Sequence, residues 1–335
     1  MPLLEVRDLK VHLKSSEGSV RAVDGVSFSI NAGETLGLVG ESGSGKSITA
    51  MSLLSLIERT KIAHHSGEIL FEGRDISNLS SAELRTLRGN EITMIFQEPM
   101  TSLNPVLTVG WQISEVLVRH RGMSRRAAAA EAVELLARVG IPSPRERARD
   151  FPHRLSGGMR QRVMIAMAIA CRPKLLIADE PTTALDVTVQ AQILELIDGL
   201  KRELNMGVLL ITHNFGIVVQ TAERTAVMYA GRIVESAATV DLFDRPGHPY
   251  TAGLLGAMPR LGDRARHGRH RLREIPGIVP RLTVERRTCS FAPRCNQRFA
   301  ACIESQPPAF ELEAGHSARC FAAAREAGLL TEGAA

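Results

Sequence analysis

The sequence predicts an α/β fold in which a mostly parallel sheet carries helices on its faces. Three short apolar runs, at residues 35–39, 175–178 and 208–211, have the length and composition of buried strands. Helical stretches separate these runs, which is the alternation that parallel strands require. After about residue 246 the pattern gives way to Pro, Arg and Cys, so we expect a small Cys-rich C-terminal tail over residues 246–335.

The remaining elements follow from hydrophobic periodicity. Residues 3–13 and 20–30 alternate apolar and polar side chains, which predicts two antiparallel strands. Residues 67–76 are typical of a further hairpin. Helices are expected at residues 48–57, over most of residues 103–170 and at residues 188–204.

Composition excludes several classes of protein. The 335 residues are 44% hydrophobic and 23% charged, which is typical of a globular protein and excludes disordered and collagen-like chains. No apolar stretch is long enough to cross a bilayer and no signal peptide opens the chain, so we expect a cytosolic protein or one attached to a membrane through a partner. Its five cysteines would then lie in a reducing compartment, where metal binding is favoured over disulfides.

The charge balance does not indicate nucleic-acid binding. Lys and Arg number 41 against 36 Asp and Glu, a formal net charge of only +5. Six arginines and two histidines concentrate within residues 260–273, but no aromatic residue lies among them to stack on bases. We therefore expect a solvated linker there, with a phosphate-facing or RNA-facing strip as the alternative.

A glycine-rich segment between a predicted strand and a predicted helix has the phosphate-loop pattern, in which two glycines enclose four residues and Lys and Ser follow. Glycines let backbone N–H groups turn inward around phosphates, and the following helix adds its positive N-terminal end. Lys46 is expected to reach the β and γ phosphates of a nucleotide, and the Ser47 hydroxyl to bind Mg²⁺. The candidate binding residues are Gly40, Ser42, Gly43, Gly45, Lys46 and Ser47.

A second candidate site begins where the apolar run at residues 175–178 ends in two carboxylates. The carboxyl ends of strands form the edge at which open α/β folds bind ligands. Asp179 would hold Mg²⁺ through its water shell, and Glu180 would polarise the attacking water. His213 follows the next strand and would contact the γ phosphate. A loop salt bridge and a structural histidine are the alternatives, which the combination with the phosphate loop disfavours.

Residues 155–161, Leu-Ser-Gly-Gly-Met-Arg-Gln, lie between these two sites and resemble the signature motif of ABC-type ATPases. The order of motifs over residues 1–245 fits that family, which implies ATP and Mg²⁺ as cofactors. It also implies a RecA-like core with an antiparallel β subdomain and a helical subdomain at about residues 100–170. Gln97 resembles the Q-loop glutamine, which senses Mg²⁺ and relays the change to an attached partner. The signature residues that would face ATP on a second ATPase subunit are Ser156, Gly157, Gly158 and Gln161.

Residues 95–105, 164–173 and 248–251 closely resemble the ATPases of oligopeptide/dipeptide (Opp/Dpp-type) importers. The resemblance implies a peripheral subunit on the cytoplasmic face of the inner membrane, bound to two transmembrane permeases that receive short peptides from an extracytoplasmic substrate-binding protein. It implies a companion ATPase that is a different chain, and no nucleic acid. Phe96 and residues 100–105 would lie near the permease's coupling helix, with ordinary core packing as the alternative.

Other functions within and outside this class stay open. Import of nickel, glutathione or oligosaccharide is an alternative, because the permeases and the binding protein select the cargo. Soluble ABC-type ATPases of translation or DNA repair are a more distant alternative. A single ATPase unit, the lack of heptads and the importer-like tail disfavour them.

Two positions depart from the family's pattern. The family stacks adenine on an aromatic residue in the early strands, but Val20 stands about where one is expected. Asn214 follows His213 where an Asp is common. We therefore expect adenine to be held by apolar contact alone, and the hinge or coupling near His213 to be altered.

Four of the five cysteines fall in the tail, at Cys289, Cys295, Cys302 and Cys320. Structural zinc sites bring ligands in close pairs, and this spacing lacks such pairs. Four thiolates from irregular loops suit a [4Fe–4S] cluster, and the resemblance implies one. Zn²⁺ and unligated thiols are the alternatives. With a cluster, we expect a tail with few helices or strands of its own that depends on the metal to fold.

Overall fold

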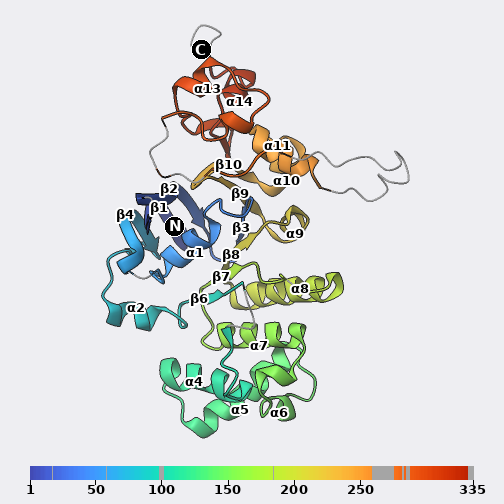
Figure 1. Ribbon diagram of the computed structural model, residues 1–335. Coiled ribbons are helices and arrows are strands. Elements are labelled where there is room, and N and C mark those ends of the chain that lie inside the picture. The colour runs from blue at the N-terminus through green and yellow to red at the C-terminus, as the bar shows by residue number, and fades with distance from the viewer. Residues whose placement is uncertain are drawn as a thin grey trace, which may run out of the picture. The chain divides into compact units, whose positions relative to one another are not determined.

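The structure, a computed structural model, describes residues 1–16, 18–57, 59–97, 102–183, 185–258, 275–280, 283 and 287–330 (Figure 1). The chain divides into two compact units. The first unit comprises Met1–Glu5, Ser29–Thr35 and Ile69–Ile211. The second unit comprises Val6–Phe28, Leu36–Glu68 and Thr212–Ala335, so it contains the predicted tail.

Parallel strands form the sheet of the first unit, in the order β8 (Gly207–Thr212), β7 (Leu175–Asp179) and β6 (Ile92–Ile95). Ile95 lies opposite Ala178, and Ala178 lies opposite Leu210. Every residue of β7 is buried, as expected for a central strand that is covered on both faces. The predicted parallel pairing is confirmed.

The middle of the first unit is helical, as the sequence predicts for residues 103–170 and 188–204, and α2 (Ser81–Leu87) is a further helix that was not expected. The helices are α2, α4 (Val109–Arg121), α5 (Arg125–Arg138), α6 (Pro144–Arg147), η2 (Pro152–Arg154), α7 (Gly157–Ile169) and α8 (Val187–Leu204). Several of them start at a side chain that accepts a backbone N–H bond, for example Ser124 at α5 and Asp186 at α8. No helix in the described ranges is both long and apolar enough to cross a membrane.

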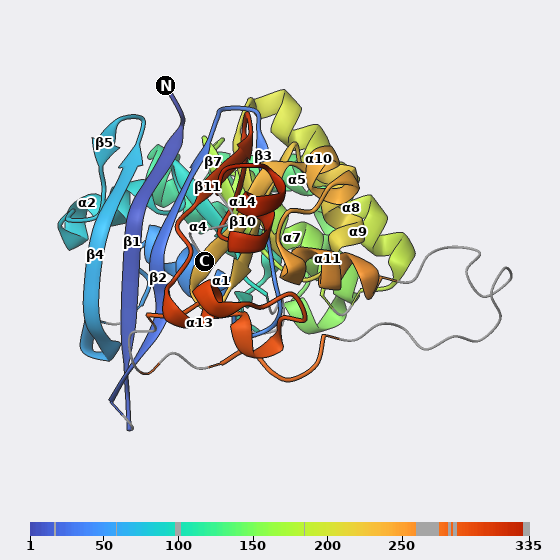
Figure 2. The same ribbon diagram turned by 90° about the horizontal axis from the view of Figure 1, so that it is seen from above.

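Long strands from the start of the chain lie side by side in the order β2 (Gly18–Ile30), β1 (Leu4–Ser15) and β4 (Ile62–Phe71), most of them within the second unit (Figure 2). The end of β4 turns back into β5 (Arg74–Asp75), with Phe71 opposite Arg74. This antiparallel pair is the hairpin predicted at residues 67–76.

A second sheet of the second unit joins the phosphate-loop strand to the tail. Strand β3 (Thr35–Val39) pairs parallel with β9 (Arg224–Tyr229), and β9 forms a hairpin with β10 (Arg232–Ala238). The edge of β10 pairs antiparallel with β12 (His316–Ala318), which in turn pairs with β11 (Phe310–Glu313).

The expectation of a tail with little secondary structure is therefore wrong. Besides β11 and β12, the C-terminal part forms α11 (Pro249–Gly256), η3 (Ala292–Arg294), α13 (Ala300–Glu304) and α14 (Phe321–Glu326). Backbone pairing with β10 and aromatic packing onto β9 hold this part in place. The other helices of the second unit are α1 (Lys46–Leu53), η1 (Arg59–Lys61), α9 (Phe215–Thr221) and α10 (Thr239–Asp244).

Candidate functional site

The phosphate loop joins β3 to α1 and is shaped by glycines. Gly40, Gly43 and Gly45 have φ values of +152°, +79° and +108°, which other residues rarely adopt. A Cβ at Gly40 would lie 2.2 Å from the Met228 carbonyl oxygen, and one at Gly45 would lie 2.2 Å from the Ala22 carbonyl oxygen. The loop can therefore press against its supports only because side chains are missing there.

Lys46 lies folded over the loop that precedes it. Its Nζ donates to the carbonyl oxygens of Gly40 at 2.8 Å and Glu41 at 3.0 Å, and the residue is only 7% exposed. Ser42 and Gly43 at the loop's tip are exposed, and Ser47 in the first turn of α1 is half-buried. A lysine, a glycine-shaped backbone and a helix N-terminus are thus gathered at one place, an arrangement that fits the phosphates of a nucleotide.

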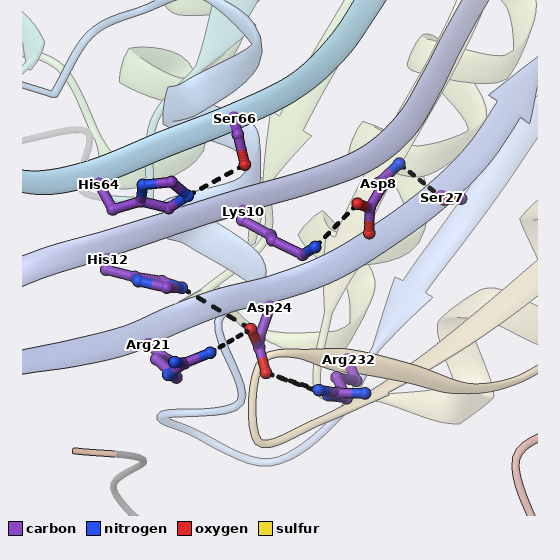
Figure 3. A network of polar contacts seen from close by, with 9 residues as sticks. All are labelled: Asp8, Lys10, His12, Arg21, Asp24, Ser27, His64, Ser66 and Arg232. Atoms are coloured by element: carbon purple, nitrogen blue, oxygen red, sulfur yellow. Dashed lines mark hydrogen bonds and ion pairs between the residues drawn. The ribbon is translucent and has the colours of Figure 1, made fainter. Parts of the chain in front are cut away.

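The turn between β9 and β10 supports the loop from one side. The Gly231 N–H donates to the Ser44 carbonyl at 2.8 Å, and the Asp24 N–H donates to the Gly231 carbonyl at 2.8 Å. The Asp24 carboxylate, 3% exposed, accepts from Arg232 Nη2 at 2.8 Å and from Arg21 Nη1 at 3.2 Å (Figure 3). This network ties β2 to the turn that holds the loop.

Electrostatics fix the charge states in this network. Burial raises the pKa of Asp24, but the hydrogen bonds and charges of Arg232 and Arg21 outweigh burial and hold that pKa below its ordinary value. Burial lowers the pKa of His12, whose Nε2 lies 3.7 Å from Asp24, and the charges of Arg21 and His64 lower it further. Asp24 is therefore ionised and His12 neutral near neutral pH.

In the first unit, the Q-loop glutamine and the carboxylate after β7 meet. Gln97 Nε2 donates to Glu180 Oε2 at 2.9 Å. The meeting follows from strand register, since each residue lies two positions beyond the paired Ile95 and Ala178. The Thr183 hydroxyl, which the sequence analysis missed, donates to the same oxygen at 2.8 Å. Glu180 itself has a left-handed φ of +48°, so its backbone is strained.

The predicted signature segment forms the start of α7. The Ser156 side chain caps this helix by accepting from the Met159 N–H at 3.3 Å. Ser156 and Gly157 are exposed, so the helix N-terminus is open to a ligand. A Cβ at Gly158 would lie 2.7 Å from a methyl of Val189 on α8, which explains the second glycine. Gln161 is 1% exposed, so its side chain lies in the protein interior.

The other predicted residues end strands or lie in them. Asp179 is the last residue of β7 and is 4% exposed. His213 directly follows β8 and is exposed, while Val20 is half-buried in β2. Asn214, the departure from the family's Asp, caps α9 by accepting from the Gly216 N–H at 2.9 Å.

The four tail cysteines lie near one another but do not form a metal site. The Cys289 N–H donates to the Cys302 carbonyl at 3.0 Å. Burial, together with the nearby thiols of Cys289 and Cys295, raises the pKa of Cys320 to about 11. All four thiols are free. In the described ranges no three Cys, His, Asp or Glu residues are arranged to hold a metal, so the expected [4Fe–4S] cluster or Zn²⁺ is not supported.

Sequence analysis also missed two residues that contact the phosphate loop from the C-terminal part. The Glu41 N–H donates to the Tyr250 hydroxyl oxygen at 2.9 Å. The Glu41 carboxylate accepts from Arg294 Nη1 at 2.7 Å and Nη2 at 3.1 Å. These partners lie 209 and 253 residues from Glu41 in sequence, so no local pattern could reveal them.

Some expectations fall on other parts of the chain. Phe96, predicted to lie near a permease, is 43% exposed, and Leu103 is buried. Residues 100–101 and the arginine cluster at residues 260–273 lie outside the described residues.

Comparison with known proteins identifies the family of the chain. The ABC transporter family model matches residues 23–183, and the model for the C-terminal region of oligopeptide/dipeptide transporters matches residues 234–302. A probable peptide ABC transporter ATP-binding protein of Sinorhizobium fredii is 52% identical, over 95% of this chain and 94% of that protein. The oligopeptide transport ATP-binding protein OppD of Bacillus subtilis is 51% identical, over 94% of this chain and 87% of that protein.

Solved structures agree with these relatives. A dimeric post-hydrolysis state of an ATP-binding cassette bound to ADP and Pi superimposes with a TM-score of 0.63 at 28% identity. It covers 70% of this chain and 98% of its own. The phosphate loop, the Gln97–Glu180 pair and the capped signature helix are thus found in a chain with close relatives along nearly its whole length. The chain belongs to the ATP-binding subunits of the peptide ABC transporter family.

Proposed function

We propose that this chain hydrolyses ATP to power the import of short peptides, as a peripheral subunit on the cytoplasmic face of the cell membrane. One observation carries the proposal: the complete, glycine-shaped phosphate loop with Lys46 folded over it lies in a chain about half identical to peptide-transport ATP-binding proteins. The helix N-terminus behind that loop favours an anionic ligand.

Each loop residue has a separate role in nucleotide binding. Mg²⁺–ATP, when bound, supplies the phosphoanhydride bond that is cleaved. The backbone N–H groups of the loop and the Lys46 ammonium hold the phosphates, and Val20 contributes apolar contact to the base. The Ser47 hydroxyl would bind Mg²⁺, and Asp179 would hold Mg²⁺ through its water shell. The loop residues that contribute N–H groups are Gly40, Ser42, Gly43 and Gly45.

Glu180 is the general base for the attacking water. Gln97 and Thr183 both donate to one of its oxygens, so they orient the carboxylate. His213 contacts the γ phosphate. We expect Glu180→Gln to keep ATP binding and lower hydrolysis by about 10²- to 10⁴-fold, because the variant lacks the base. Wild-type turnover in this variant would disprove the role.

We propose that the chain works together with a second ATPase subunit, which is a different chain. The open start of α7 at Ser156, Gly157 and Gly158, with Gln161 behind it, faces the nucleotide held by that subunit. Residues 1–245 carry the ATPase and residues 246–335 the importer-type C-terminal region. The exposed Phe96 contributes to the surface that meets two transmembrane permeases, which receive cargo from an extracytoplasmic binding protein.

Isolation of the native complex tests this function. The tagged chain is extracted from membranes in mild detergent, its partners are identified, and the complex is reconstituted in liposomes. We expect two multi-spanning subunits, a second ATPase and ATP-driven uptake of labelled di- to pentapeptides, with the Glu180→Gln complex as the inactive control. Ribosomes or DNA-repair proteins in place of membrane partners would disprove the transport function. Uptake of nickel, glutathione or oligosaccharide instead of peptides would disprove the cargo.

The four cysteines of the C-terminal region have no assigned role in the proposed cycle. The [4Fe–4S] cluster stays a prediction from the cysteine pattern and the family resemblance. Iron and acid-labile sulfide in anaerobically purified protein, compared with a variant in which all four are serine, distinguish a cluster from zinc and from free thiols. Four iron and four sulfide per chain would favour the cluster, and the absence of both iron and sulfide would exclude it.

A further inference from the structure

Glu41 places a carboxylate next to the first glycine of the phosphate loop. A negative charge at this position opposes the binding of a triphosphate, because like charges repel strongly where water is partly excluded. The structure shows how this charge is neutralised. Arg294 meets both carboxylate oxygens, at 2.7 Å and 3.1 Å, and its side chain is only 5% exposed. Such a two-pronged pair is among the stronger and more directional charge contacts in proteins.

Arg294 is itself held in one orientation. Its Nε donates to the Pro276 carbonyl at 2.8 Å, and Nη2 also donates to the Ile275 carbonyl at 3.2 Å. The guanidinium carbon lies 5.7 Å from the centre of the Tyr229 ring. Every guanidinium nitrogen therefore has an acceptor, and the fork cannot turn away from Glu41 without losing several hydrogen bonds at once.

Tyr250 fixes the backbone of the same loop residue. Its hydroxyl accepts from the Glu41 N–H at 2.9 Å, and the residue is fully buried against the rings of Tyr229 and Phe291, whose centres lie 4.6 Å and 5.4 Å away. Since the Glu41 N–H is already bonded, it points away from any phosphate.

A chain of hydrogen bonds from β10 sets the position of Tyr250. Burial lowers the pKa of His248 to about 4, so the ring is neutral and its Nδ1 accepts from the Tyr250 N–H at 3.0 Å. The His248 N–H in turn donates to the buried Glu235 carboxylate at 3.0 Å. The other Glu235 oxygen lies 2.8 Å from His316 Nε2 on β12. The C-terminal region thus reaches the phosphate loop through rigid, buried contacts.

We infer that Arg294 and Tyr250 are positioning residues of the nucleotide site, Arg294 by neutralising Glu41 and Tyr250 by fixing its backbone. The C-terminal region is then a working part of the ATP site, and the loop alone does not reach full affinity. This inference rests on the proposed nucleotide-binding function of the loop. It concerns how tightly the chain binds nucleotide and leaves the chemistry to Glu180.

The test measures the affinity of the full-length chain for the non-hydrolysable analogue Mg²⁺–AMP-PNP by calorimetry. We expect Arg294→Ala to weaken binding about tenfold, because the Glu41 carboxylate is left uncompensated. The double variant Glu41→Gln with Arg294→Ala removes that charge and should recover most of the loss. The loss in Arg294→Ala should also shrink as salt is raised from 0.05 to about 0.5 M, because salt screens repulsion.

A merely structural role predicts a different result. It would leave the double variant binding nucleotide as weakly as Arg294→Ala does, and salt would have no effect on the loss. Either of these two findings overturns the inference. Wild-type affinity in Arg294→Ala also overturns it. If Arg294→Ala does not fold, Arg294→Lys is tested in its place, because it keeps the positive charge but loses the two-pronged contact. Its affinity for nucleotide should lie between those of the wild type and Arg294→Ala. Tyr250→Phe should weaken binding about threefold, as expected for one lost neutral hydrogen bond.

Two controls separate this inference from the proposed function. Arg325→Ala removes an exposed arginine of the same region that contacts the Phe299 ring, and should bind as wild type does. Lys46→Ala should lower the affinity about 100-fold or more. If Lys46→Ala binds normally, the nucleotide site itself is wrong. If Lys46→Ala loses binding but Arg294→Ala keeps it, only the inference about the C-terminal region fails.

Discussion

The two ends of the phosphate loop are held in different ways. Its far end, at Gly45 and Lys46, is shaped by glycine conformation, by the start of α1 and by backbone contact with β2. Its near end, at Glu41, depends on two side chains from the C-terminal region. The glycine pattern of the far end can be recognised from eight consecutive residues of the sequence. The near end, in contrast, is completed by tertiary contacts. A phosphate loop is therefore less self-contained than its motif suggests.

The largest expected effect comes from breaking the link between the two ends. Lys46 belongs to the far end, and its ammonium donates to the carbonyl oxygens of Gly40 and Glu41 at the near end. Lys46→Ala removes these bonds together with the charge that holds phosphate. We expect nucleotide affinity to fall about 100-fold or more, as for a lost charged hydrogen bond. Calorimetry with Mg²⁺–AMP-PNP measures this loss, and a drop of less than about fivefold would contradict it.

A smaller effect is expected when two glycines of the loop are compared by their effect on the free energy of unfolding. Gly45→Ala forces a Cβ toward the Ala22 carbonyl, while a Cβ at Gly43 would meet nothing within 4 Å. Both positions carry a left-handed φ, so Gly43→Ala is the matched control for conformational strain. We expect Gly43→Ala to lower the free energy of unfolding by about 1 kcal/mol and Gly45→Ala by about 3 kcal/mol. Equal values in urea unfolding would mean that the close approach to Ala22 is unimportant.

The mildest effect, at the support of the far end, depends on pH. The pKa of Asp24 lies below its ordinary value of 3.8 because Arg232 and Arg21 outweigh burial. A depressed carboxyl pKa stabilises the fold above the unfolded value, and that stability is lost as the pH falls through the folded value. We expect Asp24→Asn to lower the free energy of unfolding by about 2 kcal/mol at pH 7, a moderate value because the arginines are partly exposed. Below pH 4 the difference between the two proteins should be smaller, because Asp24 itself becomes protonated.

Urea unfolding at several pH values measures this difference. Arg74→Ala, which breaks an exposed ion pair with Glu83, is the control and should change stability by less than about 1 kcal/mol. A constant difference between wild type and Asp24→Asn from pH 7 to pH 3 would show that the Asp24 charge does not contribute.

The same contrast explains what could be predicted from sequence. The apolar run that begins β7 and the glycine loop can both be recognised from local sequence, and the register of β6 with β7 then brings Gln97 to Glu180. The strand β11 could not be found, because Phe-Glu-Leu-Glu is half exposed along its length and contains no apolar run.

Arg294 and Tyr250 also escaped prediction, for a different reason. Their roles depend on partners more than 200 residues away, and one sequence carries no record of such pairs. The cysteines show the opposite failure. Their spacing suggested a metal cluster, but residues 289–320 fold around backbone pairing and small apolar contacts, and in the described ranges no metal geometry forms.

The pairing of Glu41 with Arg294 also sets an order of events during synthesis. The two residues are 253 positions apart, so a ribosome adding about 5–20 residues per second makes the loop roughly 10–50 s before its neutralising partner. A nascent chain that has not yet reached Arg294 would already contain the glycines and the lysine of the loop, but the Glu41 carboxylate beside them would be uncompensated. Full affinity for nucleotide would arrive only when the C-terminal region has folded, so unfinished or truncated chains would compete poorly for ATP and would consume little of it.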